Sequence, residues 1–141
     1  MKPFAFVFPG QGSQSVGMLD GWGDHPVVRD TIDEASAALD LDIGALIHSG
    51  PKEQLDLTTN TQPVMLTAGV ACYRAWLAET HHAPAIVAGH SLGEYSALVV
   101  AGALRLADAL PLVRFRAQAT PAVSITGCVF VVRSSCSLGP L

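Results

Sequence analysis

The Gly-x-Ser-x-Gly pattern at residues 89–93 constrains the fold of this chain more than any other feature. It follows the short apolar run of residues 85–88, which is typical of a covered strand, and it precedes a helical pattern over residues 94–101. A serine between a strand and a helix projects from a sharp turn, which is crowded unless the residues two before and two after it lack side chains. The glycine spacing therefore predicts a strand-turn-helix unit with Ser91 at its tip.

Ser91 in this position is suited to nucleophilic chemistry. The turn directs the start of the next helix toward the serine, and the backbone amide of Leu92 becomes available to a developing oxyanion. A five-residue match also occurs by chance, and its plain alternative is a tight turn without a chemical role. The flanking strand and helix favour the nucleophile. His90 points away from Ser91 at the strand end, so we interpret it as a structural imidazole and not as the base.

A second constraint is the glycine-rich loop of residues 10–17, which follows the β-rich apolar run of residues 4–8. Pro9 and Gly10 end that run, which is typical of a strand covered on both faces in a parallel sheet. The loop has short polar side chains and no hydrophobic periodicity, so its backbone amides are free to serve a ligand. Oxyanion donors are found at the carboxyl ends of strands, and the amide of Gln11 is our candidate. The alternative is a flexible turn.

Hydrophobic periodicity predicts several helices around these two strands. Residues 62–78 form a long apolar pattern that we expect to be buried at the centre, with Pro63 tolerated in the first turn. Further patterns cover residues 26–39, 43–47, 94–101 and 106–119, while residues 52–60 indicate a loop or a short helix. The order of strand, helices, strand and helices favours an α/β sandwich with a parallel sheet. Since two strands are clear before residue 120, we expect an incomplete sheet.

Three separated motifs occur in order along the chain: Phe8-Pro9-Gly10-Gln11-Gly12-Ser13-Gln14, Thr61-Gln62-Pro63 and Gly89-His90-Ser91-Leu92-Gly93-Glu94-Tyr95. Together they resemble malonyl-CoA:acyl-carrier-protein transacylases and related acyltransferase domains over residues 1–119. The resemblance implies the N-terminal part of a three-layer, parallel-sheet acyltransferase core of the α/β-hydrolase-like type. It also implies transfer of a malonyl group from malonyl-CoA to the phosphopantetheine thiol of acyl carrier protein, in fatty-acid synthesis.

The resemblance also assigns roles to site residues. Ser91 would carry the malonyl ester, the amides of Gln11 and Leu92 would bind the oxyanion, and Gln62 would line the active site. The family places an arginine on a helix after the serine turn to hold the free carboxylate of the malonyl group, and Arg116 occupies that position. A planar guanidinium is suited to this role because it binds a carboxylate through two parallel hydrogen bonds.

Arg114 lies two residues from Arg116 and is expected to face elsewhere on a helix. The plain alternative is that both arginines are solvated helix charges. His81 and His82 precede a strand and are expected to be solvated, and His25 and His48 have no predicted partner.

Residues 120–141 depart from the family pattern. Residues 123–132 are β-rich and have no following helical pattern, so we predict that residues 120–141 are a frameshifted or otherwise foreign tail. The ferredoxin-like subdomain, the C-terminal core and the catalytic histidine of family members have no counterpart in the sequence. A serine is a weak nucleophile without a base, so we expect severely reduced or no transacylase activity from this chain.

Composition excludes several classes of partner. The net charge is −4 and no basic cluster is present, so the sequence indicates neither nucleic-acid binding nor a polybasic membrane-binding segment. The N-terminal apolar run is too short for a signal peptide or a transmembrane span, which predicts a cytoplasmic location. Cys72, Cys128 and Cys136 lack zinc-site spacing, so no metal and no cofactor apart from the substrate malonyl-CoA is expected.

Three alternative functions remain open. An acyltransferase domain of a polyketide synthase would share every residue named above. A serine hydrolase, such as a thioesterase or a lipase, would use the same turn but would have no need of Arg116. A non-catalytic remnant would at most bind acyl carrier protein or CoA.

Overall fold

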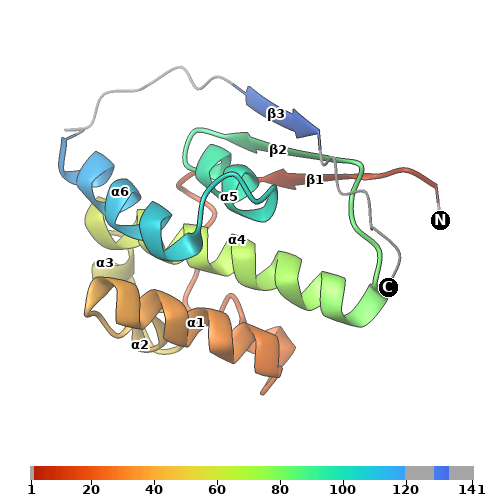
Figure 1. Cartoon of the computed structure of the whole chain (residues 1–141). Helices are drawn as coiled ribbons and strands as arrows, with labels where there is room; N and C mark the ends of the chain where they lie inside the picture. Colours follow the sequence, from red (N-terminus) through yellow and green to blue (C-terminus); the bar gives the residue numbers. More distant parts are fainter. Residues whose placement is uncertain (1, 120–128, 134–141) are drawn as a thin grey trace.

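The fold is described from a computed structural model, which covers residues 2–119 and 129–133. The elements follow in the order β1 (Ala5–Phe8), η1 (Asp20–Trp22), α1 (Pro26–Leu39), α2 (Ile43–His48), α3 (Lys52–Leu55), α4 (Thr58–Thr80), β2 (Ile86–His90), α5 (Gly93–Val100), α6 (Leu106–Ala119) and β3 (Val129–Arg133) (Figure 1). The predictions for Cys128, Cys136 and most of the tail lie outside the described residues. Among the described residues, no helix combines the length and the apolar character that a bilayer crossing requires.

The sheet is mixed and has the strand order β1-β2-β3 in the described part of the chain. β1 and β2 are parallel, with Phe6 opposite Val87 and Phe8 opposite Gly89, as expected from the sequence. β3 runs antiparallel to β2, with Val131 opposite Ala88, so the expectation of a parallel sheet is confirmed for β1 and β2 but not for β3. Figure 1 shows β1 and β2 pointing the same way and β3 pointing the opposite way.

The faces of β1 differ in burial. Phe8 is buried, and the ring of Phe6 contacts those of Tyr73 and Trp76 on α4 at centroid distances of 5.7 and 5.8 Å. Val7 on the opposite face is 71% exposed. The prediction of a strand covered on both faces was therefore wrong for β1, because the described helices pack against one face only. A third layer on the other face stays a prediction.

α4 is the central helix, and its position was predicted correctly. Its first half is buried almost without interruption, from Thr61 to Ala68. It begins at Thr58 and not at Gln62, so Pro63 lies in the second turn and the prediction that it lies in the first was wrong. Pro63 cannot donate to the carbonyl four residues earlier. The start of the helix is held instead by the Thr61 hydroxyl, which donates to the carbonyls of Leu55 and Leu57 at 2.6 and 3.1 Å.

The remaining helices match the sequence patterns to within a residue or two. α1 buries Val28, Ile32, Ala35 and Leu39 and α6 buries Leu110 and Val113 in the same helical core, while Ala117 of α6 is buried outside that cluster. Gly102, at φ +78°, follows the end of α5 as the glycine there predicts. The larger core lies between helices, whereas a smaller cluster of Phe8, Val87 and Ala97 joins α5 to the sheet. These two cores set β2 and α5 at a fixed angle around the Ser91 turn.

Candidate functional site

The turn between β2 and α5 is as tight as the glycine spacing predicts. A Cβ at Gly89 would overlap the Gly93 carbonyl, and a Cβ at Gly93 would overlap the carbonyl of Phe8 at the end of β1. Ser91 itself has φ +53°, a left-handed conformation that costs an L-residue free energy. Backbone packing over-determines this conformation, and the half-buried Ser91 side chain therefore projects from a fixed point.

The glycine-rich loop after β1 lies directly against this turn. A Cβ at Gly10 would lie 3.1 Å from the His90 carbonyl oxygen and 3.7 Å from Ser91 Cβ. Gln11 follows at once, so its backbone is adjacent to the nucleophile candidate. The Gln11 side chain turns away, and its Nε2 donates to Thr58 Oγ1 at 3.3 Å. The structure thus brings the two regions that the sequence singled out to one place.

Ser91, Gln62 and Arg116 meet at this point, although they come from three different elements. Arg116 Nη2 donates to Ser91 Oγ at 2.9 Å, and Arg116 Nη1 donates to Gln62 Oε1 at 2.9 Å. Gln62 is 4% exposed, and the guanidinium carbon of Arg116 lies 5.9 Å from the centroid of the Tyr95 ring. The buried amide and the aromatic ring fix the orientation of the guanidinium. A fixed cation therefore lies within hydrogen-bonding distance of the serine hydroxyl.

The backbone amides of Gln11 and Leu92 have no recorded hydrogen bond within residues 2–119 and 129–133. Leu92 is fully buried and directly precedes α5, where amides lack partners within the helix. This geometry is compatible with two donors to an oxyanion. Their role stays a prediction.

Arg114 faces elsewhere, as expected from its place on the helix. Its Nη1 donates to the Leu39 carbonyl at the end of α1, at 3.3 Å. Neither arginine is therefore a merely solvated charge.

The histidines of the described residues do not serve Ser91. His90 is exposed, and the only recorded hydrogen bond of Ser91 Oγ within the described part of the chain comes from Arg116. His25 contacts Glu79 at 3.0 Å and His48 contacts Asp20 at 2.5 Å, two pairs that the sequence analysis missed. Since the partners lie far apart in the chain, no local pattern indicates them.

Sequence analysis also missed the polar network behind the glycine-rich loop. Gln14 Oε1 accepts from the Gly12 amide at 2.8 Å, and Gln14 Nε2 donates to Asp56 Oδ1 at 3.0 Å. Gln14 belongs to the first of the three motifs, so its place in that motif could have indicated a role for it. No sequence pattern near Asp56 indicates that Asp56 is the partner of Gln14.

No group of three or more His, Cys, Asp and Glu side chains in the described ranges is arranged to hold a metal ion. Cys72 is half-buried, and burial raises the pKa of its thiol. It lines a mostly apolar cavity of about 270 Å³ between β1 and α4, together with Phe6, Phe8 and Met65. Ser91, Gln62 and Arg116 do not line this cavity.

Comparison with known proteins places these residues in context. The model of a family described as acyl transferase domain matches residues 5–135. The malonyl CoA-acyl carrier protein transacylase of Escherichia coli (strain K12) is 57% identical over 119 residues, which are 84% of this chain and 38% of that protein. The corresponding protein of Haemophilus influenzae is 52% identical over 120 residues, again 84% of this chain and 38% of the relative.

Solved structures agree with this similarity. An acyl-carrier-protein S-malonyltransferase from Burkholderia pseudomallei has a TM-score of 0.82 at 69% identity, over 84% of this chain and 38% of that one. A malonyl-transacylase in complex with a type II polyketide synthase acyl-carrier protein has a TM-score of 0.79 at 49% identity, over 85% of this chain and 40% of that one. The chain thus spans a little over a third of the length of the relatives that it matches.

Proposed function

Because the chain belongs to the acyl transferase domain family, we propose that it carries the acyl-accepting part of a malonyl-CoA:acyl-carrier-protein transacylase, with Ser91 as the nucleophile. The observation that supports this most is the pair of 2.9 Å hydrogen bonds that place the Arg116 guanidinium between Ser91 and Gln62. An enzyme that transfers neutral acyl groups has no use for a fixed cation at its nucleophile. An enzyme that transfers malonyl groups needs one for the free carboxylate.

The proposed reaction has two displacements. Ser91 Oγ attacks the thioester carbonyl of malonyl-CoA while a base takes its proton, and the Gln11 and Leu92 amides stabilise the oxyanion that forms. The tetrahedral intermediate collapses with loss of CoA as the thiol and leaves a malonyl ester on Ser91. The phosphopantetheine thiol of acyl carrier protein then attacks this ester, and Ser91 is released with its proton restored.

Arg116 would serve as the carboxylate clamp in both displacements. In the free protein its Nη2 is used by the Ser91 hydroxyl and its Nη1 by Gln62. Acylation of Ser91 converts the hydroxyl into an ester, whose alkoxy oxygen is a weaker acceptor than a carboxylate, so Nη2 would donate to the malonyl carboxylate instead while Gln62 keeps the guanidinium oriented. The rearrangement needs no large movement of the arginine.

The base is the component without a candidate among the described residues, since no imidazole contacts Ser91 Oγ there. We therefore propose that residues outside the described part supply it in the complete enzyme, and that the 141-residue chain alone is still acylated slowly at Ser91 but completes transfer to acyl carrier protein at a severely reduced rate or not at all. Residues 1–119 would be the N-terminal part of the core, without the ferredoxin-like subdomain. Acyl carrier protein as partner, fatty-acid synthesis as pathway and the cytoplasm as location belong to the same proposal.

The test uses radiolabelled malonyl-CoA and the purified chain in a single-turnover format. We expect slow labelling that is abolished in Ser91→Ala, because the label is an ester on that oxygen. Arg116→Ala should reduce malonyl labelling about 100-fold, because the carboxylate loses its charged partner, and should spare labelling from acetyl-CoA. Arg114→Ala is the matched control and should behave like the wild type.

Two results would contradict the proposal. Labelling that persists in Ser91→Ala would exclude Ser91 as the nucleophile. Malonyl labelling that is unchanged in Arg116→Ala would exclude the clamp and would favour a thioesterase-like or lipase-like hydrolase, which has no need of Arg116. A polyketide synthase acyltransferase would behave as the proposed enzyme does, and absence of all labelling would favour a non-catalytic remnant.

A further inference from the structure

The glycine-rich loop is anchored at both ends. At its start, Gly10 lies against His90 and Ser91 so closely that a Cβ there would be 3.1 Å from the His90 carbonyl oxygen. At its other end, the Gly17 amide donates to the Ile47 carbonyl of α2 at 2.6 Å. The residues between these anchors have no regular secondary structure to fix them. Their position therefore depends on side-chain contacts.

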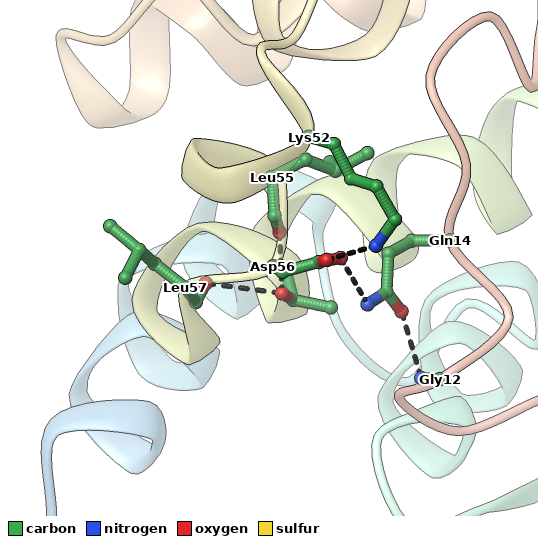
Figure 2. A network of polar contacts seen from close by, with 7 residues as sticks. Gly12, Gln14, Lys52, Leu55, Asp56 and Leu57 are labelled. Carbon is green, nitrogen blue, oxygen red and sulfur yellow. Dashed lines mark hydrogen bonds and ion pairs between the residues drawn. The ribbon is translucent and has the colours of Figure 1, made fainter.

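Gln14 makes the contacts that hold the middle of the loop (Figure 2). Its Oε1 accepts from the Gly12 amide at 2.8 Å, and its Nε2 donates to Asp56 Oδ1 at 3.0 Å. One primary amide thus ties the loop backbone to the carboxylate of the residue that caps the end of α3. We call these three residues, Gly12, Gln14 and Asp56, the loop brace.

The far end of the loop brace is firmly placed. Leu55 beside Asp56 is fully buried, and the buried Thr61 hydroxyl donates to the carbonyls of Leu55 and Leu57 on either side of Asp56. The Lys52 ammonium and the Gln14 amide, in that order, hold the pKa of the Asp56 carboxyl below its ordinary value. The carboxylate is therefore charged at neutral pH and is the stronger form of acceptor.

The near end of the loop brace fixes one peptide group beside Ser91. Gly12 has φ +114°, a conformation that L side chains rarely adopt, and its amide is directed at Gln14. The preceding amide, that of Gln11, has no recorded partner among the described residues and lies next to the Gly10 contact with Ser91. The hydrogen bond from the Gly12 amide fixes the peptide group between Gln11 and Gly12. It therefore limits the directions that the Gln11 amide can take.

We propose that Gln14 and Asp56 are positioning residues, which hold Gly12 in its left-handed conformation and so keep the Gln11 amide aligned with Ser91. The part of this inference that concerns acyl transfer rests on the proposed function. The part that concerns the loop backbone does not. Neither residue touches the reacting atoms, so both act through the backbone of residues 11 and 12.

The test exchanges donor and acceptor within the loop brace. Gln14→Glu places a second carboxylate against Asp56 and should break the contact, whereas Asp56→Asn keeps an amide oxygen for Gln14. In the double variant, the carboxylate introduced at position 14 would accept from the amide introduced at position 56 and from the Gly12 amide, and the net charge would equal that of the wild type. Gln54→Ala on the exposed side of α3 is the matched control, since no contact of its side chain with the loop brace is recorded.

The first readout is hydrogen exchange of the Gly12 and Gln11 amides by NMR, which needs no activity. We expect exchange at Gly12 to be about tenfold faster in Gln14→Glu, close to wild type in Asp56→Asn, and restored in the double variant. Thermal midpoints should stay within a few degrees of one another. Unchanged exchange at Gly12 in Gln14→Glu, or no restoration in the double variant, would overturn the loop brace.

The second readout is single-turnover labelling of Ser91 by malonyl-CoA. The labelling rate at saturation should fall about tenfold in Gln14→Glu without a change in the half-saturating concentration, and should recover in the double variant. Faster exchange with an unchanged labelling rate would overturn the positioning role. A wild-type chain that takes up no label would contradict the proposed function, and hydrogen exchange would still decide whether the loop brace fixes Gly12.

Discussion

The turn at residues 89–93, which carries Ser91, lies against the loop at residues 10–17, but different interactions hold the two segments in place. The turn is shaped by backbone packing, because Gly89 and Gly93 leave no room for a Cβ. The loop is shaped by side-chain hydrogen bonds, because Gly12 has open space around it and is fixed by Gln14. The first kind of constraint is steric and cannot be removed without collision. The second can be loosened one bond at a time.

The turn and the loop should therefore respond differently to substitution. A substitution in the turn should affect the stability of the whole fold, since β1, β2 and α5 meet there. A substitution in the loop itself should affect local order more than stability, and a substitution at the buried Thr61 that supports it should have an intermediate effect on stability. The predictions below test this contrast, from the largest effect to the smallest.

Gly89→Ala should have the largest effect. Its Cβ would overlap the Gly93 carbonyl, so β2 and α5 would have to separate, and we expect a loss of at least about 3 kcal/mol in the free energy of unfolding. Urea denaturation followed by circular dichroism measures this loss. Gly21→Ala is the control, because a Cβ there has no neighbour within 4 Å. A Gly89→Ala protein as stable as the control would show that the turn is not shaped by close backbone packing at Gly89.

Thr61→Val should have an intermediate effect on the support of the loop. It keeps the shape of the buried side chain but removes the hydroxyl bonds to Leu55 and Leu57, which costs about 2 kcal/mol. The same denaturation experiment applies, with Thr59→Val as the control in the first turn of α4. If both variants lost the same stability, the turn that carries Asp56 would not depend on the Thr61 hydroxyl.

Ser91 allows the backbone strain in the turn to be measured. Ser91→Ala and Ser91→Gly both lose the bond from Arg116, but only glycine adopts φ +53° without a Cβ penalty. We expect Ser91→Gly to be more stable than Ser91→Ala by about 0.5 to 1 kcal/mol. At Ser49, where φ is −119°, glycine should show no such advantage over alanine. Equal stabilities at Ser91 would show that the turn is relaxed.

Lys52→Met should have the smallest effect. Lys52 pairs with Asp56, but its side chain is 74% exposed, and an exposed ion pair contributes little. We therefore expect no measurable change in the thermal midpoint or in the hydrogen exchange of Gly12. A clear loss of Gly12 protection would mean that the charge of Lys52, and not the Gln14 bond alone, holds Asp56 in place.

Much of the fold was predictable because its signals are local. Apolar residues at helical spacing predicted α1 and α6 with their buried faces, and glycines in fixed positions predicted the turn around Ser91. β1 shows where local signals fail, since its apolar sequence predicted two covered faces while Val7 is 71% exposed. Whether a strand face is covered depends on what packs there, and periodicity does not report that.

The prediction of where α4 begins was wrong for a related reason. Pro63 is typical of a first helical turn, and the sequence prediction placed it there. The structure begins the helix at Thr58, because the Thr61 hydroxyl holds the carbonyls of Leu55 and Leu57. The antiparallel direction of β3 was not predicted either, because the residue pattern of a strand does not specify its direction in the sheet.

The sequence alone is enough to predict that Ser91 stands on a sharp turn between a strand and a helix, because that turn needs only glycines two residues before and two residues after the serine. The contacts around the serine are visible only in the folded structure, although the family resemblance had already indicated Gln62 and Arg116. Arg116 is 25 residues from Ser91 and 54 from Gln62, and Gln14 is 42 from Asp56. Contacts over such separations depend on how α4, α6 and α3 pack against the sheet, so no local pattern of residues specifies them.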